Sequence, residues 1–217
     1  DGTASMRDMI KKVKKRAAHF YEDFLDAMMK GGKPINREWF RMKVIVFRDY
    51  KVDSEPMVES PFFDMTTPEG RDGYKRFVMN IEESGGGDAP ENALEAIYKA
   101  ISSDWVEKGG RFRRHPILLF TDAPALSLRD KDRVNRPGYP LDAPATLEDL
   151  RDLFLHGGDQ SMSYNGKRGR LVVFAPEKTG WDWVRSTEKA YLVPTEEDGG
   201  CKDVDMDQAL AVLVASF

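Results

Sequence analysis

Three short segments of the chain carry oxygen-bearing side chains of the kind that bind a hard metal ion. The first is Asp1-Gly2-Thr3-Ala4-Ser5, the second is Gly85-Gly86-Gly87-Asp88, and the third is Thr121-Asp122. Carboxylate and hydroxyl oxygens suit Mg²⁺, which takes oxygen ligands and keeps several waters. Hydroxyls spaced two residues apart on a loop can turn toward the same ion as the leading carboxylate. The candidate metal ligands are therefore Asp1, Thr3, Ser5, Asp88 and Asp122.

Each segment also has an interpretation that needs no metal. Thr3 or Ser5 can cap a helix that follows it, and Asp88 can cap the next helix. Asp122 can cap a short helical turn in the same way. The metal interpretation depends on finding all three segments together, because open α/β sheets bind their ligands outside the carboxyl ends of the strands.

The rest of the sequence predicts helices and strands that alternate along the chain. Helices are expected where apolar residues recur at intervals of three and four, and buried strands where short apolar runs are continuous. The predicted helices span residues 6–30, 68–83, 88–101, 146–156 and 203–217, and the predicted strands span 42–47, 58–63, 116–120, 171–174 and 190–193. Residues 127–143 are rich in Pro, Asp and Arg and are expected to form a long surface loop.

This alternation predicts an α/β fold with a Rossmann-like, doubly wound, mostly parallel sheet and helices on both faces. No linker-like segment or internal repeat is present, so residues 1–217 are expected to form a single domain. Such a fold needs a strand before its first helix, yet a helix is predicted almost directly after Asp1. Because the loss of a central strand would leave its neighbours' backbone groups unpaired, we expect a short apolar strand immediately upstream of Asp1, in a longer protein.

Composition argues against several classes of protein. The net charge is −4, whereas nucleic-acid-binding domains usually carry a basic excess. No run of about 18 apolar residues is present, so no membrane insertion is expected. The single cysteine, Cys201, excludes an intrachain disulfide and favours a reducing compartment such as the cytoplasm. A signal peptide upstream of Asp1 would instead make the protein secreted.

The first segment resembles the D-x-[ST]-x-S metal-ion-dependent adhesion site (MIDAS) of von Willebrand factor A (vWA) domains. Residues 85–88 and the L-L-F-T-D-A segment at 118–123 resemble the second and third metal loops of that family, in the same order. The resemblance implies that Asp1, Thr3 and Ser5 bind the cation from the first loop, and that Asp122 binds it directly or through water. It extends over the whole chain and implies a vWA-like fold that lacks its first strand.

The resemblance also implies a binding module and not an enzyme. In vWA domains the ion is incompletely coordinated, and an Asp or Glu of a partner protein supplies the last ligand. No Ser-His-Asp or Cys-His arrangement in the sequence suggests catalysis. We expect a scaffold or adaptor in the cytoplasm, with Mg²⁺, or else Mn²⁺ or Ca²⁺, as its cofactor.

The basic side chains of the 127–143 loop form a second candidate feature. The loop follows Asp122 and should border the same face, and Arg129 and Arg133 are the predicted partner-binding residues in it. A basic rim beside a cation would attract an acidic partner and speed its association. The alternative is a solvated loop without a binding role.

A Mg²⁺-dependent phosphohydrolase similar to the haloacid dehalogenases is the main alternative function. The motif of that family ends in D-G-T, which Asp1-Gly2-Thr3 matches, and its nucleophilic Asp would lie just upstream. Thr121, Lys108 and Asp159 would supply the remaining catalytic groups, but their spacing fits the family poorly. A phosphate-binding loop is a weaker alternative, because Gly85-Gly86-Gly87 lacks the Gly-Lys-Ser/Thr ending.

Asp88 is the point at which the chain departs from the vWA pattern, which usually has Thr on the second loop. Asp1, Asp88 and Asp122 together would place three negative charges around one divalent ion, which weakens its attraction for a further carboxylate. We predict that Asp88→Thr binds a carboxylate-bearing partner more tightly than the unchanged chain does, with altered metal affinity. Calorimetric titration with metal and then with partner measures both. If both affinities were unchanged, Asp88 would not lie near the metal ion.

Overall fold

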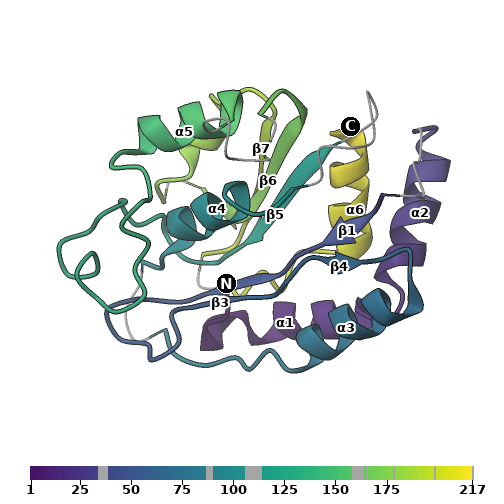
Figure 1. The fold of residues 1–217 in the computed structure, drawn as a ribbon, viewed down its shortest axis with the longest axis horizontal. Coiled ribbons are helices and arrows are strands. Elements are labelled where there is room, and N and C mark those ends of the chain that lie inside the picture. The colour runs from purple at the N-terminus through teal and green to yellow at the C-terminus, as the bar shows by residue number, and fades with distance from the viewer. Residues whose placement is uncertain are drawn as a thin grey trace.

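The structure is a computed structural model that describes residues 1–33, 39–86, 90–105, 114–157, 164, 166–177, 179–197 and 199–216. Over these residues the chain is a mixed α/β protein, and its strands form three small sheets (Figure 1). Strand β1 (Arg41–Met42) pairs with β4 (Phe63–Asp64), and β2 (Ile45–Phe47) pairs with β3 (Met57–Glu59), both antiparallel. The third sheet is parallel and has the order β5 (His115–Phe120), β6 (Gly169–Pro176), β7 (Ala190–Thr195).

The parallel sheet forms where the sequence has its continuous apolar runs. In β6, residues Leu171 to Ala175 are fully buried, as expected for a strand covered on both faces. His115 lies opposite Gly169, and Leu171 lies opposite Ala190, so β6 is the central strand. The three strands predicted at 116–120, 171–174 and 190–193 are confirmed, and each extends slightly beyond its predicted bounds.

Helices pack against both faces of this sheet. Leu171 and Val173 of β6 belong to one apolar cluster with α4 (Ala93–Ile101) and α5 (Leu147–His156). The alternate residues Val172 and Phe174 belong to a second cluster with α1 (Arg7–Arg16) and α6 (Met206–Ala215). In Figure 1, α4 and α5 lie on one side of the strands and α1 lies on the other. The period of two along β6 therefore divides the core into two layers.

The predicted strand 42–47 is wrong in detail. The segment forms two short strands, and both pair antiparallel with residues 57–64. Between them, the backbone N–H of Val44 donates to the hydroxyl of Ser60 at 2.9 Å. Because a side-chain oxygen there takes the place of a backbone carbonyl, the regular ladder is interrupted. The strand predicted at 58–63 is likewise divided, into β3 and β4, and Pro61 lies in the gap between them.

The helices predicted at 6–30 and 68–83 also differ from those of the structure. The helix predicted at 6–30 is divided at residues 17–19 into α1 and α2 (Phe20–Lys30), which follow a 3-10 turn at Ala4–Met6. The two halves pack in different apolar clusters. Met9 and Ile10 of α1 share a cluster with β6, whereas Phe24 and Met28 of α2 share one with the C-terminal half of α6. Helix α3 (Pro68–Met79) ends at Met79, with Asn80 as its C-cap, before the predicted residue 83.

The remaining elements complete the described chain. Helix α4 begins at Ala93, five residues after the predicted start at Asp88, which lies outside the described residues. Residues 127–143 form turns without helix or strand, as predicted, and further 3-10 turns span Gly166–Arg168 and Asp182–Val184. In the part of the chain that is described, no helix has the length and apolar character needed to cross a membrane.

Helix α5 provides a stability test of the sequence-based assignment. Thr146 and Asp149 form a reciprocal capping box, in which the Asp149 N–H donates to the Thr146 hydroxyl at 3.1 Å. We predict that Thr146→Ala lowers the free energy of unfolding by about 1 kcal/mol, because the first turn loses its cap. Thr146→Ser keeps the hydroxyl and is expected to retain most of that stability. Urea denaturation of both variants measures the difference, and equal losses would show that the hydroxyl does not cap the helix.

Candidate functional site

The first segment lies at the carboxyl ends of β2 and β5. The backbone nitrogen of Asp1 donates to the carbonyl oxygen of Phe120, the last residue of β5, at 3.0 Å. The next backbone nitrogen, that of Gly2, donates to the carbonyl oxygen of Phe47, the last residue of β2, at 2.9 Å. These two hydrogen bonds place Asp1 and Gly2 between two strand ends that belong to separate sheets.

A continuous set of hydrogen bonds joins the first segment to the third. The Thr121 hydroxyl donates to Asp1 Oδ2 at 2.8 Å, and the Thr3 hydroxyl donates to Asp1 Oδ1 at 2.6 Å. Thr3 Oγ1 lies 3.1 Å from Ser5 Oγ, and the Ser5 hydroxyl donates to Asp122 Oδ1 at 2.9 Å. Four of the five predicted ligands thus form one cluster, although 117 positions separate Ser5 from Asp122. Thr121 belongs to the same cluster and was not among the predicted ligands.

Burial leaves this cluster accessible from one side. Thr3, Thr121 and Asp122 are buried, whereas Ser5 is exposed. The other carboxylate oxygen of Asp122, Oδ2, accepts a hydrogen bond from the Gly200 N–H at 2.8 Å. Among the described residues, no Lys or Arg forms a salt bridge with Asp1 or Asp122. Asp122 is thus a buried carboxylate that is held by neutral donors, a situation that favours a nearby cation.

The donor set of the cluster fits a hard cation. The hydroxyls of Thr3 and Ser5 donate hydrogen bonds to carboxylates, so the lone pairs of both hydroxyl oxygens remain available to a metal ion. Neighbouring ligands of an octahedral Mg²⁺ lie about 2.9 Å apart, close to the 3.1 Å between the two hydroxyl oxygens and the 2.9 Å between Ser5 and Asp122. The described residues contain no group of three or more His, Cys, Asp and Glu that could hold a metal ion. Metal binding here would therefore depend on two carboxylates together with hydroxyls.

The second segment approaches the cluster through its glycines. The Ser84 N–H donates to the Gly2 carbonyl at 3.1 Å, and the Arg48 guanidinium donates to the carbonyls of both residues. Gly86 has a φ of +80°, and a Cβ there would lie only 2.9 Å from Thr3 Cβ. Only glycine allows the backbone to pass so close to the first segment. Asp88, the ligand predicted on this loop, lies outside the described residues.

Glu91 is a further acidic residue, three positions after Asp88. It is buried, with an exposure of 3%, and its Oε1 would lie 3.6 Å from a Cβ on Gly86. Its Oε2 is also buried and has no hydrogen-bond partner among the described residues. Burial, with contributions from Asp49 and Asp53, raises the pKa of Glu91 to about 8. A buried carboxyl group with an unpaired oxygen therefore lies beside the glycine loop.

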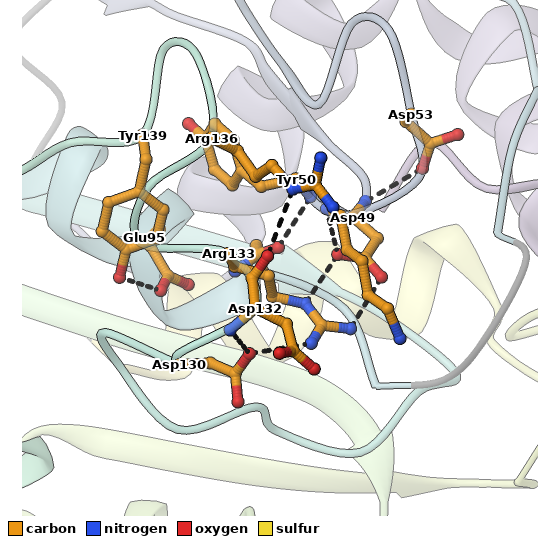
Figure 2. A network of polar contacts seen from close by, with 11 residues as sticks. Asp49, Tyr50, Asp53, Glu95, Asp130, Asp132, Arg133, Arg136 and Tyr139 are labelled. Carbon is orange, nitrogen blue, oxygen red and sulfur yellow. Dashed lines mark hydrogen bonds and ion pairs between the residues drawn. The ribbon is translucent and has the colours of Figure 1, made fainter.

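The partner-binding role predicted for Arg133 does not fit its position. Arg133 is buried and forms two hydrogen bonds with the fully buried carboxylate of Asp49, at 2.6 and 2.7 Å (Figure 2). Its third contact is with Asp130 at 3.0 Å. Arg133 thus fastens the 127–143 loop to the segment that follows β2. This pair could not be predicted from local sequence patterns, because 84 positions separate its members.

A second buried contact holds the same loop in place. The Tyr139 hydroxyl donates to Glu95 Oε1 at 2.7 Å, and Glu95 lies fully buried in α4 (Figure 2). Burial raises the pKa of Glu95 above its usual range. Arg129, the other predicted partner-binding residue, is exposed, but its guanidinium donates to the carbonyls of Leu141 and Ala143. The loop is therefore built on internal polar contacts, and Arg129 alone of the predicted pair reaches solvent.

Comparison with known proteins adds no assignment to this geometry. The chain matches no family model, and no curated protein matches it in sequence. The function of the site must therefore be argued from the residues themselves.

The buried pair of Arg133 and Asp49 predicts a large effect on stability. Arg133→Leu leaves the Asp49 carboxylate buried without its counter-charge, which should cost about 3–5 kcal/mol of unfolding free energy. Arg136→Leu is the matched control, because Arg136 lies three residues further along the same loop and is exposed. Its effect should stay within about 0.5 kcal/mol. Chemical denaturation of both variants tests this, and equal stabilities would mean that Arg133 is free to serve a partner.

Proposed function

We propose that this chain is a divalent-metal-dependent protein-interaction module, similar to vWA domains, that binds an acidic group of a partner at a MIDAS-like site. Asp1, Thr3, Ser5 and Asp122 would hold the cation, with Asp88 of the second loop as a further ligand. Mg²⁺ is the expected ion, and Mn²⁺ or Ca²⁺ are the alternatives. The proposal includes a doubly wound, Rossmann-like sheet completed by one more strand.

The observation that carries this proposal is the cluster of hydroxyls and carboxylates from segments more than 100 positions apart. Helix caps alone do not account for it, because Thr3 makes no side-chain capping bond to the following turn. Its hydroxyl and that of Ser5 are instead directed to Asp1 and Asp122. Both carboxylates lack a basic partner within the described chain. Hydroxyl oxygens between two carboxylates are the oxygen ligands that a hard cation prefers.

The exposure of Ser5 supports a binding role for this cluster. Asp122 and Thr3 close the site on the inner side, whereas Ser5 and Ala4 face solvent. A bound divalent cation would supply a Lewis-acidic centre for a ligand oxygen approaching from that side. Two site carboxylates balance a charge of +2, so an additional ionised group, such as Asp88, would weaken the attraction for an incoming carboxylate. We therefore expect modest affinity for acidic ligands and a scaffold or adaptor role, with the cytoplasm as the expected location.

Titration with Mn²⁺, followed by electron paramagnetic resonance, tests metal binding directly. We predict one bound Mn²⁺ that Mg²⁺ displaces, and a loss of affinity of at least about tenfold in Ser5→Ala and in Asp122→Asn. Ser5→Ala leaves the charge unchanged, so its effect separates ligation from general electrostatic attraction. Ser102→Ala is the matched control, because Ser102 is also an exposed serine but lies at the C-terminal end of α4, outside the cluster. Mn²⁺ affinities that are equal in all four proteins would overturn the proposed site.

The partner class requires a second measurement with the same proteins. Peptides that contain Asp or Glu should bind in Mg²⁺, lose binding in EDTA, and fail to bind when Asn or Gln replaces the acidic residue. The hydrolase alternative predicts instead that the chain with its upstream segment releases phosphate from p-nitrophenyl phosphate. Peptide binding that survives EDTA would contradict a metal-bridged contact.

A further inference from the structure

Three arginines lie at the amino ends of β5 and β6. Arg114 directly precedes β5, Arg168 directly precedes β6, and Arg170 is the second residue of β6. In the parallel ladder His115 lies opposite Gly169. The residues before them, Arg114 and Arg168, are therefore neighbours across the two strands. The candidate metal cluster lies at the other end of the six-residue strand β5, roughly 20 Å away, so the arginines form a separate group.

Arg170 has a structural role in this group. Its guanidinium donates to the carbonyl of Ser216, the C-cap residue of α6, and to the carbonyl of Gly169 at 2.7 Å. The C-terminal end of a helix has unpaired carbonyl groups and a partial negative charge, so an arginine stabilises it. In Figure 1 this end of α6 lies at the same end of the molecule as the start of β5. Helix capping thus accounts for Arg170.

Among the described residues, no acidic group neutralises Arg168. Its side chain is half-buried, and its Nη1 atom is buried without a hydrogen-bond partner in the described chain. No described Asp or Glu forms a salt bridge with Arg168 or Arg170. A guanidinium group stays charged in proteins, and a charge that is withdrawn from water without a partner is costly. An anion beside Nη1 of Arg168 would supply both a hydrogen-bond acceptor and a counter-charge.

The three positive charges also act on one another. Burial lowers the pKa of Arg114, and the nearby charges of Arg170 and Arg168 lower it further. All three side chains are half-buried, unlike the fully exposed arginines of a solvated surface. Water therefore screens their repulsion incompletely. An anion between Arg114 and Arg168 would replace this repulsion with attraction.

We propose that Arg114 and Arg168 bind a phosphate group at the amino ends of β5 and β6, with Arg170 adding positive charge from the cap of α6. A phosphate group with a charge of about −2 has at least three acceptor oxygens, so separate guanidinium groups can donate to it. A carboxylate has only two oxygens, and a single arginine can occupy both. The same chemistry serves a free phosphate ion and a phosphoserine of a partner protein. The inference does not depend on metal binding.

Titration with inorganic phosphate in EDTA, followed by phosphorus NMR, tests this site. EDTA removes any metal ion through which phosphate could bind instead. We expect one phosphate per chain, and a loss of affinity of at least about tenfold in Arg168→Gln, because charge-assisted hydrogen bonds are lost. Arg136→Gln is the matched control, because it removes the same charge from an exposed arginine of the 127–143 loop. Arg168→Lys keeps the charge without the planar fork and should retain part of the affinity.

Thermal unfolding of the same proteins separates binding from packing. Phosphate should raise the Tm of the unchanged chain and of Arg136→Gln, but not that of Arg168→Gln. Without phosphate, Arg168→Gln should unfold at the same temperature as the unchanged chain or higher, because one of three like charges is removed. A lower Tm with unchanged phosphate affinity would give Arg168 a packing role and would overturn the proposal. Equal phosphate affinities in Arg168→Gln and Arg136→Gln, or no phosphate binding by the unchanged chain, would overturn it as well.

A phosphoserine peptide distinguishes the two sources of the phosphate group. If the peptide binds more tightly than inorganic phosphate, and its unphosphorylated form does not bind, the site takes a phosphorylated segment of a partner protein. If the peptide binds equally or more weakly, the site takes a free phosphate ion. Both results support a phosphate site, provided that Arg168→Gln weakens the binding.

Discussion

The two hydrogen bonds from Asp1 and Gly2 to the ends of β5 and β2 are the contacts on which the site depends. They place the first residue of the loop between two strands that belong to different sheets. Only with its backbone held there can the Asp1 carboxylate reach both Thr121 and Thr3. Ligand sites form at the carboxyl ends of such strands because the loops converge there. In this chain the convergence is produced by backbone hydrogen bonds at a single dipeptide.

The buried carboxylates of this protein are stabilised in two different ways. Asp49 has a bidentate arginine, and this pair fixes the 127–143 loop. Asp122 is equally buried but accepts only from a hydroxyl and a backbone N–H among the described groups. A charge buried without a counter-charge is costly, so proteins pair such groups or bind cations with them. The contrast indicates that Asp49 has a structural role and that Asp122 is suited to a functional one.

Local signals in the sequence predicted much of the fold, and non-local contacts explain the rest. The strands β5 to β7 and the Thr146 cap follow from short apolar runs and from one capping motif. The division between α1 and α2 could not be predicted, because residues 17–19 contain no Gly or Pro that would indicate a helix end. It arises from packing in two different apolar clusters. The order of the three metal-loop segments predicted the contact between Ser5 and Asp122. Arg133 was predicted to bind a partner, because its actual neighbour, Asp49, is remote in sequence.

The register of Asp1 against β5 determines whether the hydroxyl–carboxylate cluster can form. The hydrogen bond from Asp1 N to Phe120 O sets this register, and thereby the distance from the Asp1 carboxylate to Thr121. A shift of one residue would turn the Asp1 side chain to the opposite face of the sheet, because side chains alternate along a strand. The carboxylate would then leave the cluster while Thr3 and Ser5 moved with it. The backbone contacts of Asp1 and Gly2 with β5 and β2 thus position the cluster without belonging to it, as a scaffold must when a site is built on a loop.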